Sequence, residues 1–138
     1  MLKHAETDAD IARCFAVMAE LRTHLRQESF VDRVRQQQAE GYRLAFVEHD
    51  NEIAAVAGYR ITTNLFLGKN LYVDDLVTSD QLRSRGYGEK LMSALRNIAK
   101  DNNCAHLHLD SGTQRKQAHR FYLREGMVIS SFHFDEKL

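Results

Sequence analysis

Apolar and polar residues in the N-terminal part of the chain follow the period of an α-helix. Thr7 is a suitable N-cap, and Asp8 and Asp10 would lie in the first turn. The apolar positions that follow are Ile11, Cys14, Phe15, Met18 and Leu21. This spacing predicts an amphipathic helix. A second, short helix is expected to begin at Ser29 and to end at Gly41.

The period changes to that of β-strands after Gly41. Residues 42–49 and 52–63 are rich in β-branched, aromatic and small apolar residues, and Asp50-Asn51 between them is a turn signal. These residues therefore predict a β-hairpin. Residues 64–70 are expected to form a loop, and residues 71–78 a third strand.

The rest of the chain returns to alternating helices and strands. Residues 87–102 carry a clear apolar stripe, which comprises Leu91, Leu95, Ile98 and Ala99. The pattern predicts a short strand over residues 105–109 and a helix over residues 115–124 that stops at Gly126. Residues 127–134 are expected to form a last strand.

This order of elements defines the expected fold class. A hairpin in the first half and strand–helix–strand–helix–strand in the second predict an α/β fold of the α+β mixed-sheet kind, with about four helices covering the sheet. No repeat, linker or low-complexity tract interrupts the 138 residues, so we expect a single domain over residues 1–138.

Charge and composition narrow the functional class. The chain has 19 basic and 19 acidic residues, whereas proteins that bind nucleic acid are usually clearly basic. No window approaches the ~20 apolar residues that span a bilayer, and the N-terminal residues are too polar for a secretory signal. Two cysteines, Cys14 and Cys104, are best interpreted as buried thiols. We therefore expect a cytoplasmic protein with no nucleic-acid or membrane partner.

The most informative segment is Arg83-Ser84-Arg85-Gly86-Tyr87-Gly88, between a predicted strand and a predicted helix. The first N–H groups of a helix have no internal acceptors, so they attract an anion. Gly86 and Gly88 would let a pyrophosphate approach the backbone, and Arg83 and Arg85 add charge. The glycine pattern differs from that of a dinucleotide-binding turn, and the Gly-Lys-Ser/Thr of a Walker A loop is absent. Glycines that merely help a loop to enter a helix are the alternative interpretation.

At these residues the sequence resembles the GNAT acetyltransferase superfamily. The R/Q-x-x-G-x-G/A motif of that family matches residues 83–88, although Ser84 stands where many members have a further glycine. Residues 122–127 resemble its later Tyr-x-x-x-Gly-Phe signature, with Met127 in place of Phe. Residues 115–126 are also similar to the aminoalkylphosphonate acetyltransferases, and residues 71–76 to the acidic strand of the diamine acetyltransferases. The resemblance implies a GNAT-like fold over almost the whole chain.

The same resemblance implies acetyl-coenzyme A as the cosubstrate. Its pantetheine arm is expected to pair with the backbone of one strand, and its pyrophosphate to lie on the turn and the helix start. The residues implied in cofactor binding are Leu76, Val77, Thr78, Arg83, Ser84, Arg85, Gly86, Tyr87, Gly88, Glu89 and Arg115.

The resemblance also implies roles in the chemistry. Tyr122 is expected to be the general acid that protonates the leaving thiolate, and a purely structural aromatic is the alternative. Asp74 and Asp75 are candidates to hold the amine or to act as its base through water; since they are adjacent on a strand, they are expected to face opposite sides. A solvated or ion-paired strand end is their alternative. Glu48 is a lesser candidate for the base.

His106, His108 and Asp110 alternate along a predicted strand and would share one face. Such a face could suit zinc, or it could pack against polar helix residues. No loop supplies an evident fourth ligand, so we expect no metal site.

The predicted function is an acetyl-CoA-dependent N-acetyltransferase that acts on the primary amine of a small molecule. A peptide or protein N-acetyltransferase and a non-catalytic coenzyme A-binding module are the alternatives. The resemblance also implies a homodimer.

Overall fold

A computed structural model describes residues 1–138, which divide into two compact units, Met1–His108 and Leu109–Leu138. The expectation of a single domain stays a prediction.

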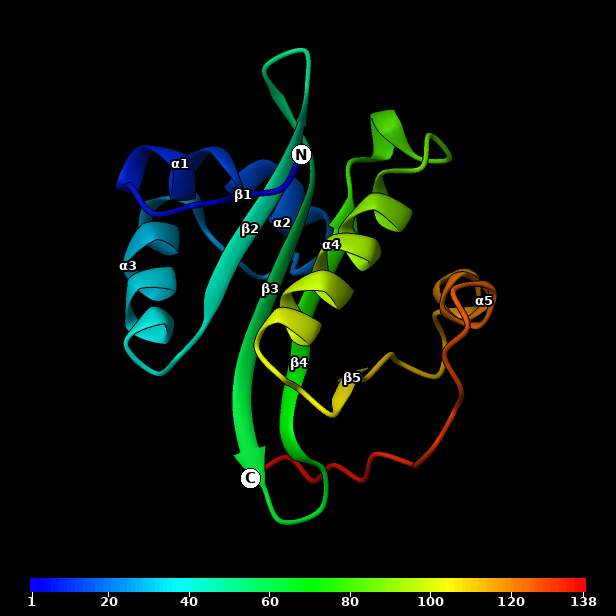
Figure 1. The fold of residues 1–138 in the computed structure, drawn as a ribbon. Coiled ribbons are helices and arrows are strands. Elements are labelled where there is room, and N and C mark those ends of the chain that lie inside the picture. The colour runs from blue at the N-terminus through cyan, green and yellow to red at the C-terminus, as the bar shows by residue number, and fades with distance from the viewer. The chain divides into compact units, whose positions relative to one another are not determined.

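The sheet has five strands in the order β1-β2-β3-β4-β5, and the pairs β1–β2, β2–β3 and β3–β4 are antiparallel. Figure 1 shows that β3 and β4 form a long hairpin. The strands are β1 (Lys3–His4), β2 (Arg43–His49), β3 (Glu52–Asn64), β4 (Gly68–Thr78) and β5 (His106–Leu109). The predicted mixed α/β fold class is confirmed.

Turn residues define both hairpins. Asp50 and Asn51 have φ values of +50° and +65°, and two such residues favour the twist of a tight hairpin. The loop predicted over residues 64–70 is largely wrong, because β3 continues to Asn64 and β4 begins at Gly68. The Asn64 side chain accepts a hydrogen bond from Leu67 N at 2.7 Å, which closes a short turn. Residues 65–67 of this turn are apolar, so their sequence does not resemble that of a tight turn.

Three helices precede the hairpins: α1 (Asp8–Arg13), α2 (Phe15–Leu21) and α3 (Gln27–Gln38). The predicted cap is confirmed, since Asp10 N donates to Thr7 Oγ1 at 3.1 Å. The first predicted helix divides at Cys14, so the chain has five α-helices rather than four. The predicted cap at Ser29 is wrong: α3 begins two residues earlier, and the Ser29 hydroxyl donates back to the Arg26 carbonyl instead.

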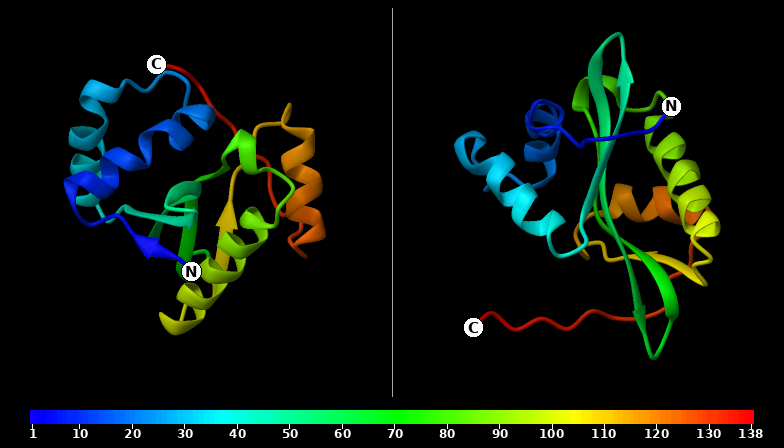
Figure 2. Two further views of the ribbon diagram at one scale, coloured as in Figure 1. Left: turned by 90° about the horizontal axis from the view of Figure 1, so that it is seen from above. Right: turned by 60° about the vertical axis from the view of Figure 1, so that its left-hand side comes forward.

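The 15-residue helix α4 (Tyr87–Asp101) follows a short 3₁₀ turn, η1 (Asp80–Leu82), and packs against β2, β3 and β4. Figure 2 shows α4 on one face of the sheet and α1 to α3 on the other. The predicted apolar stripe is confirmed, with Leu91 and Leu95 fully buried. On the opposite face Ile11, Met18 and Phe30 belong to the main core cluster. The hairpin strands are therefore covered on both sides.

Strand β5 is short and lies next to β4 in the sheet. Ala105 N donates to Lys69 O at 2.7 Å, which holds the start of β5 at the Gly68 end of β4.

The second unit contains α5 (Lys116–Arg124), which ends before Gly126 with φ +88°, as predicted. The last predicted strand is wrong, because residues 127–138 form no regular structure and the side chains of Val128, Ile129, Phe132 and Phe134 are exposed. An alternating pattern supplies side chains for a strand, but the ladder also needs a hydrogen-bonding neighbour.

No helix of the chain combines the length and apolarity needed to cross a membrane.

Candidate active site

A β-bulge at Asp74 shapes the site. Asp75 lies opposite Gly58 and Val73 lies opposite Tyr59, so Asp74 is an extra residue between two residues that are adjacent on β3. The expectation that Asp74 and Asp75 face opposite sides is therefore wrong. A bulge breaks the alternation of the strand, and both aspartates line one cavity.

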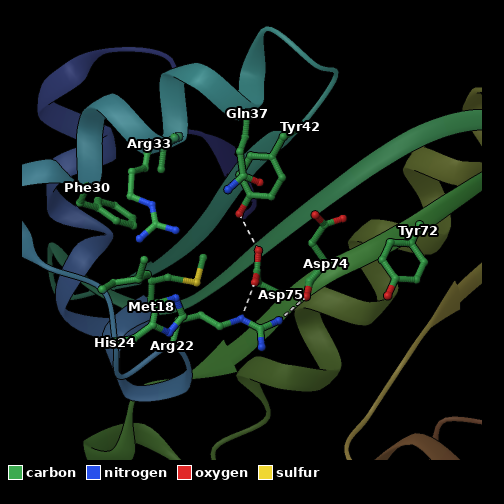
Figure 3. Close-up of a pocket in the computed structure, with 12 residues that line it drawn as sticks. Met18, Arg22, His24, Phe30, Arg33, Gln37, Tyr42, Tyr72, Asp74 and Asp75 are labelled. Carbon is green, nitrogen blue, oxygen red and sulfur yellow. Dashed lines mark hydrogen bonds and ion pairs between the residues drawn. The ribbon is translucent and has the colours of Figure 1, made fainter. Parts of the chain in front are cut away.

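The cavity, here called the Asp75 cavity, has a volume of about 340 Å³. It lies among α2, α3, the segment that connects them, and the bulged part of β4 (Figure 3). Its lining residues are Met18, Arg22, His24, Leu25, Phe30, Arg33, Val34, Gln37, Tyr42, Tyr72, Asp74 and Asp75. Helix α4 and η1 supply none of them.

Asp75 is held by two side chains from distant parts of the sequence. Arg22 Nε donates to Asp75 Oδ1 at 2.9 Å, and the Tyr42 hydroxyl donates to Oδ2 at 2.7 Å. Arg22 Nη2 also donates to the backbone carbonyl of Asp74 at 2.7 Å, which fixes the bulge itself. Both oxygens of Asp75 are thus engaged, and burial together with this carboxylate holds the pKa of Tyr42 well above its ordinary value.

Asp74 has a different environment from that of Asp75. Arg60 Nε donates to Asp74 Oδ2 at 3.0 Å, whereas the buried Oδ1 has no hydrogen-bond partner. Burial raises the pKa of Asp74, against the lowering effect of Arg60. A carboxylate with a raised pKa and a spare oxygen is the better proton acceptor of the two.

The turn before α4 has the geometry of an anion site. Gly86 is the N-cap of α4 with φ +83°, and no side chain caps this helix end. The first helix hydrogen bond runs from Lys90 N to Gly86 O, so the N–H groups of Tyr87, Gly88 and Glu89 have no acceptor within the helix. No atom lies within 4 Å of the place where a Gly86 Cβ would stand. Exposed amides at an uncapped helix end fit a pyrophosphate.

Arginine charge and one tyrosine complete this turn. Arg83 pairs with Asp80 at 2.7 Å, and Ser84 has a positive φ of +64°. Arg85 is exposed. The buried Tyr87 makes a short hydrogen bond with His49 at the end of β2, which ties the start of α4 to the sheet.

The backbone of Leu76, Val77 and Thr78 lies at the end of β4 nearest this turn. These residues pair with Ala57, Val56 and Ala55 of β3. Because β5 is only four residues long and starts beside Lys69, the other edge of β4 has no strand next to residues 76–78. An extended ligand could therefore hydrogen-bond there as an additional strand would.

Two predicted site residues belong to the second unit. Arg115 is the N-cap residue of α5, and Tyr122 lies within that helix, half-buried, with its ring edge-on to Phe121 at 5.4 Å. Their roles stay predictions.

The comparisons with known proteins identify the family. The model of the acetyltransferase (GNAT) family matches residues 9–127. The chain belongs to the GNAT acetyltransferase family. It is 33% identical over 135 residues to the uncharacterized N-acetyltransferase YhdJ of Bacillus subtilis, with 96% of this chain and 95% of that protein covered. It is 27% identical over 145 residues to the aminoalkylphosphonate N-acetyltransferase of Salmonella typhimurium, with 99% and 90% covered.

Solved structures show the same fold. A protein from Bacillus halodurans, described as a transcriptional regulator, superposes with a TM-score of 0.88 at 21% identity and covers 100% of this chain and 99% of that chain. The GNAT fold is thus confirmed for this chain, and the family together with its named N-acetyltransferase relatives makes the protein an acetyltransferase.

Other candidate residues from the sequence line neither the Asp75 cavity nor the turn before α4. Glu48 is ion-paired with Lys3 and Arg13, whose hydrogen bonds hold its pKa below the ordinary value, so it is a poor base. Burial raises the pKa of the Cys14 thiol to about 12, as suits an inert core thiol, whereas Cys104 is only half-buried.

The alternating histidines also have ordinary surroundings. His108 shares a hydrogen bond with the buried Asn70 at 2.8 Å, His106 is exposed, and Asp110 is paired with His133 at 3.6 Å. No three His, Cys, Asp or Glu side chains of the chain are grouped so that they could hold a metal ion.

Sequence reasoning missed four residues that line the cavity, Arg22, His24, Arg33 and Tyr42, and it also missed Arg60, which pairs with Asp74. An arginine on a helix and a tyrosine before a strand carry no local signal of a site. Gly58 was the available signal, because a glycine within a strand often marks a bulge or a close approach.

Proposed function

We propose that the protein transfers the acetyl group of acetyl-CoA to the primary amine of a small molecule bound in the Asp75 cavity. The size of this cavity is the observation that carries the proposal. A volume of about 340 Å³, bounded by two helices and a strand, suits a compact acceptor.

The residues around α4 fit the cosubstrate that this family generally uses. The free amides of Tyr87, Gly88 and Glu89 would hold the pyrophosphate, with Arg83, Ser84, Arg85 and Gly86 around it. The open edge of β4 at Leu76, Val77 and Thr78 would pair with the amides of the pantetheine arm. Arg115 would add a cation near the phosphates.

Acetyl-CoA supplies a thioester whose carbonyl carbon is the electrophile. The acceptor nitrogen bonds to that carbon, and the carbon–sulfur bond breaks. An ammonium acceptor is thereby converted into an amide, while the products also include a free thiol and one proton.

Two residues of this chain would transfer the protons of the reaction. Asp74, with a raised pKa and an unpartnered oxygen, would accept the proton of the ammonium through water. Asp75 would position the bulge rather than react, since both of its oxygens are occupied by Arg22 and Tyr42. The Tyr122 hydroxyl would protonate the departing sulfur, as its place in the family motif implies.

The test is Tyr122→Phe, which removes only the hydroxyl and keeps the packing beside Phe121. Turnover should fall about 10²–10⁴-fold, the usual contribution of a general acid. Affinity for acetyl-CoA should hardly change, because the lost donor acts on charge that develops in the transition state. Turnover by thiol release and binding by titration calorimetry are measured on the same preparation.

A matched control is Tyr59→Phe, which removes the hydroxyl of a buried tyrosine that contacts His4 and lies outside the proposed machinery. Turnover of Tyr122→Phe within about threefold of the unaltered enzyme would exclude this tyrosine as the acid. Acetylation of proteins but of no small amine would replace the small-molecule proposal with a protein acetyltransferase.

A further inference from the structure

Arg22, Arg33, Asp74 and Asp75 line the Asp75 cavity, and Arg60 pairs with Asp74 without lining it, so cations outnumber carboxylates in this group by one. Asp75 is paired with Arg22 at 2.9 Å, and Asp74 with Arg60 at 3.0 Å. Each carboxylate therefore has its own guanidinium, and Tyr42 donates a further hydrogen bond to Asp75. The two carboxylates are therefore neutralised by Arg22 and Arg60, and no negative charge remains for a third arginine.

Arg33 is the cation left over. It lines the cavity from α3, and it forms no ion pair or hydrogen bond within the chain. Figure 3 shows its guanidinium directed from the helix toward the side of the cavity where Met18 and Arg22 lie. A guanidinium carries five donors in a planar fork that matches carboxylate and phosphate oxygens.

His24 adds donor capacity to the same cavity. It lies in the segment between α2 and α3, is exposed, and is likewise without a partner in the chain. The apolar part of the lining consists of Met18, Leu25, Phe30 and Val34. Such a surface suits a short aliphatic spacer.

We infer that the acceptor is an amine that carries an anionic group, a carboxylate or a phosphonate, and that Arg33 binds this group while the amine lies toward Asp74. The inference rests on the proposed function, since it assigns the class of acceptor for that site. It makes Arg33 a specificity-determining residue and gives the acceptor a fixed direction in the cavity.

The experiment compares acceptors of similar length that differ in the charge of one end. The probes are β-alanine, 2-aminoethylphosphonate, n-propylamine and 1,3-diaminopropane, each assayed by thiol release from acetyl-CoA. We expect kcat/KM for the better of the two anionic amines to exceed that of n-propylamine by about tenfold or more. The diamine should be the poorest, because its second ammonium meets Arg33.

The variant Arg33→Gln removes the charge at an exposed helix position. It should raise KM for the anionic amines by about tenfold and leave the values for n-propylamine and acetyl-CoA unchanged. Arg26→Gln is the matched control, because Arg26 stands at the start of the same helix, is 79% exposed and does not line the cavity. Calorimetric titration of each variant with 2-aminoethylphosphonate or β-alanine provides a readout that does not depend on turnover.

The outcomes separate the two proposals. Equal use of neutral and anionic amines, a preference for the diamine, or an unchanged KM in Arg33→Gln would overturn the inference and leave acetylation of small amines standing. If no amine releases thiol, the proposed function fails. In that case weaker binding of an anionic amine to Arg33→Gln than to Arg26→Gln would still assign the anion site, and equal binding would remove it.

Discussion

Gly58 shows how one residue controls the shape of the cavity. Gly58 lies opposite Asp75 in the sheet. The phenol ring of Tyr42 packs against Gly58, and its hydroxyl donates a hydrogen bond to the Asp75 carboxylate. A Cβ at position 58 would overlap the ring and the hydroxyl of Tyr42. Only glycine therefore leaves room for the hydrogen bond that holds Asp75.

The prediction at this scale is that Gly58→Ala destabilises the protein by about 1–3 kcal/mol, because overpacking forces the buried Tyr42 ring to move. Urea unfolding measures the cost. Tyr42→Leu removes the ring, so the double variant should lose less stability than the two single variants added together. Additive costs would show that the two residues do not share this contact.

The turn and helix α4 act together at the scale of elements. An uncapped helix of 15 residues presents free amides and the positive end of its dipole at Gly86, while Leu91, Met92 and Leu95 bury the opposite side of the same helix. The packing of α4 therefore fixes the position of the proposed phosphate site. The hydrogen bond between Tyr87 and His49 restrains the first turn further.

Gly86→Asp places a carboxylate at this helix start. Like-charge contact costs several kcal/mol, so the dissociation constant for acetyl-CoA should rise about a hundredfold or more. Titration calorimetry measures it. Gly68→Asp is the matched control, because Gly68 also has a positive φ, of +68°, and open space around its Cβ position, but is the first residue of β4, directly after the β3–β4 turn. If both variants bind acetyl-CoA like the unaltered protein, the phosphates lie elsewhere.

For the whole molecule, ligand binding and folding are linked. A cosubstrate that binds only the folded chain at about 100 times its dissociation constant adds about 2.7 kcal/mol to the free energy of unfolding. For a chain of 138 residues this corresponds to a rise of roughly 9 °C in melting temperature. Calorimetric scans with increasing acetyl-CoA should show this rise, and Gly86→Asp should abolish it. A melting temperature that does not depend on acetyl-CoA would contradict the proposed cosubstrate. A homodimer and a cytoplasmic location stay predictions.

Much of this protein could be predicted from sequence because the relevant interactions are local. Thr7 caps α1 through an amide three residues away, and Asp50-Asn51 adopts the positive φ values that a tight hairpin needs. The stripe on α4 and the glycine turn before it likewise depend on residues a few positions apart. The family motif, and with it the activity, was therefore visible in the sequence.

Only the tertiary structure decided what pairs across long separations. Arg22 and Asp75 are 53 positions apart, and Tyr42 and Asp75 are 33 positions apart. The hydrophobic periodicity of the sequence therefore predicts neither contact. The bulge at Asp74 depends on the register between β3 and β4, which places both aspartates on one cavity against the alternation of an ordinary strand. Arg33 became a candidate for recognition only when the structure paired Asp75 with Arg22 and Asp74 with Arg60. The balance of charge in a cavity depends on how the elements pack and not on any one segment.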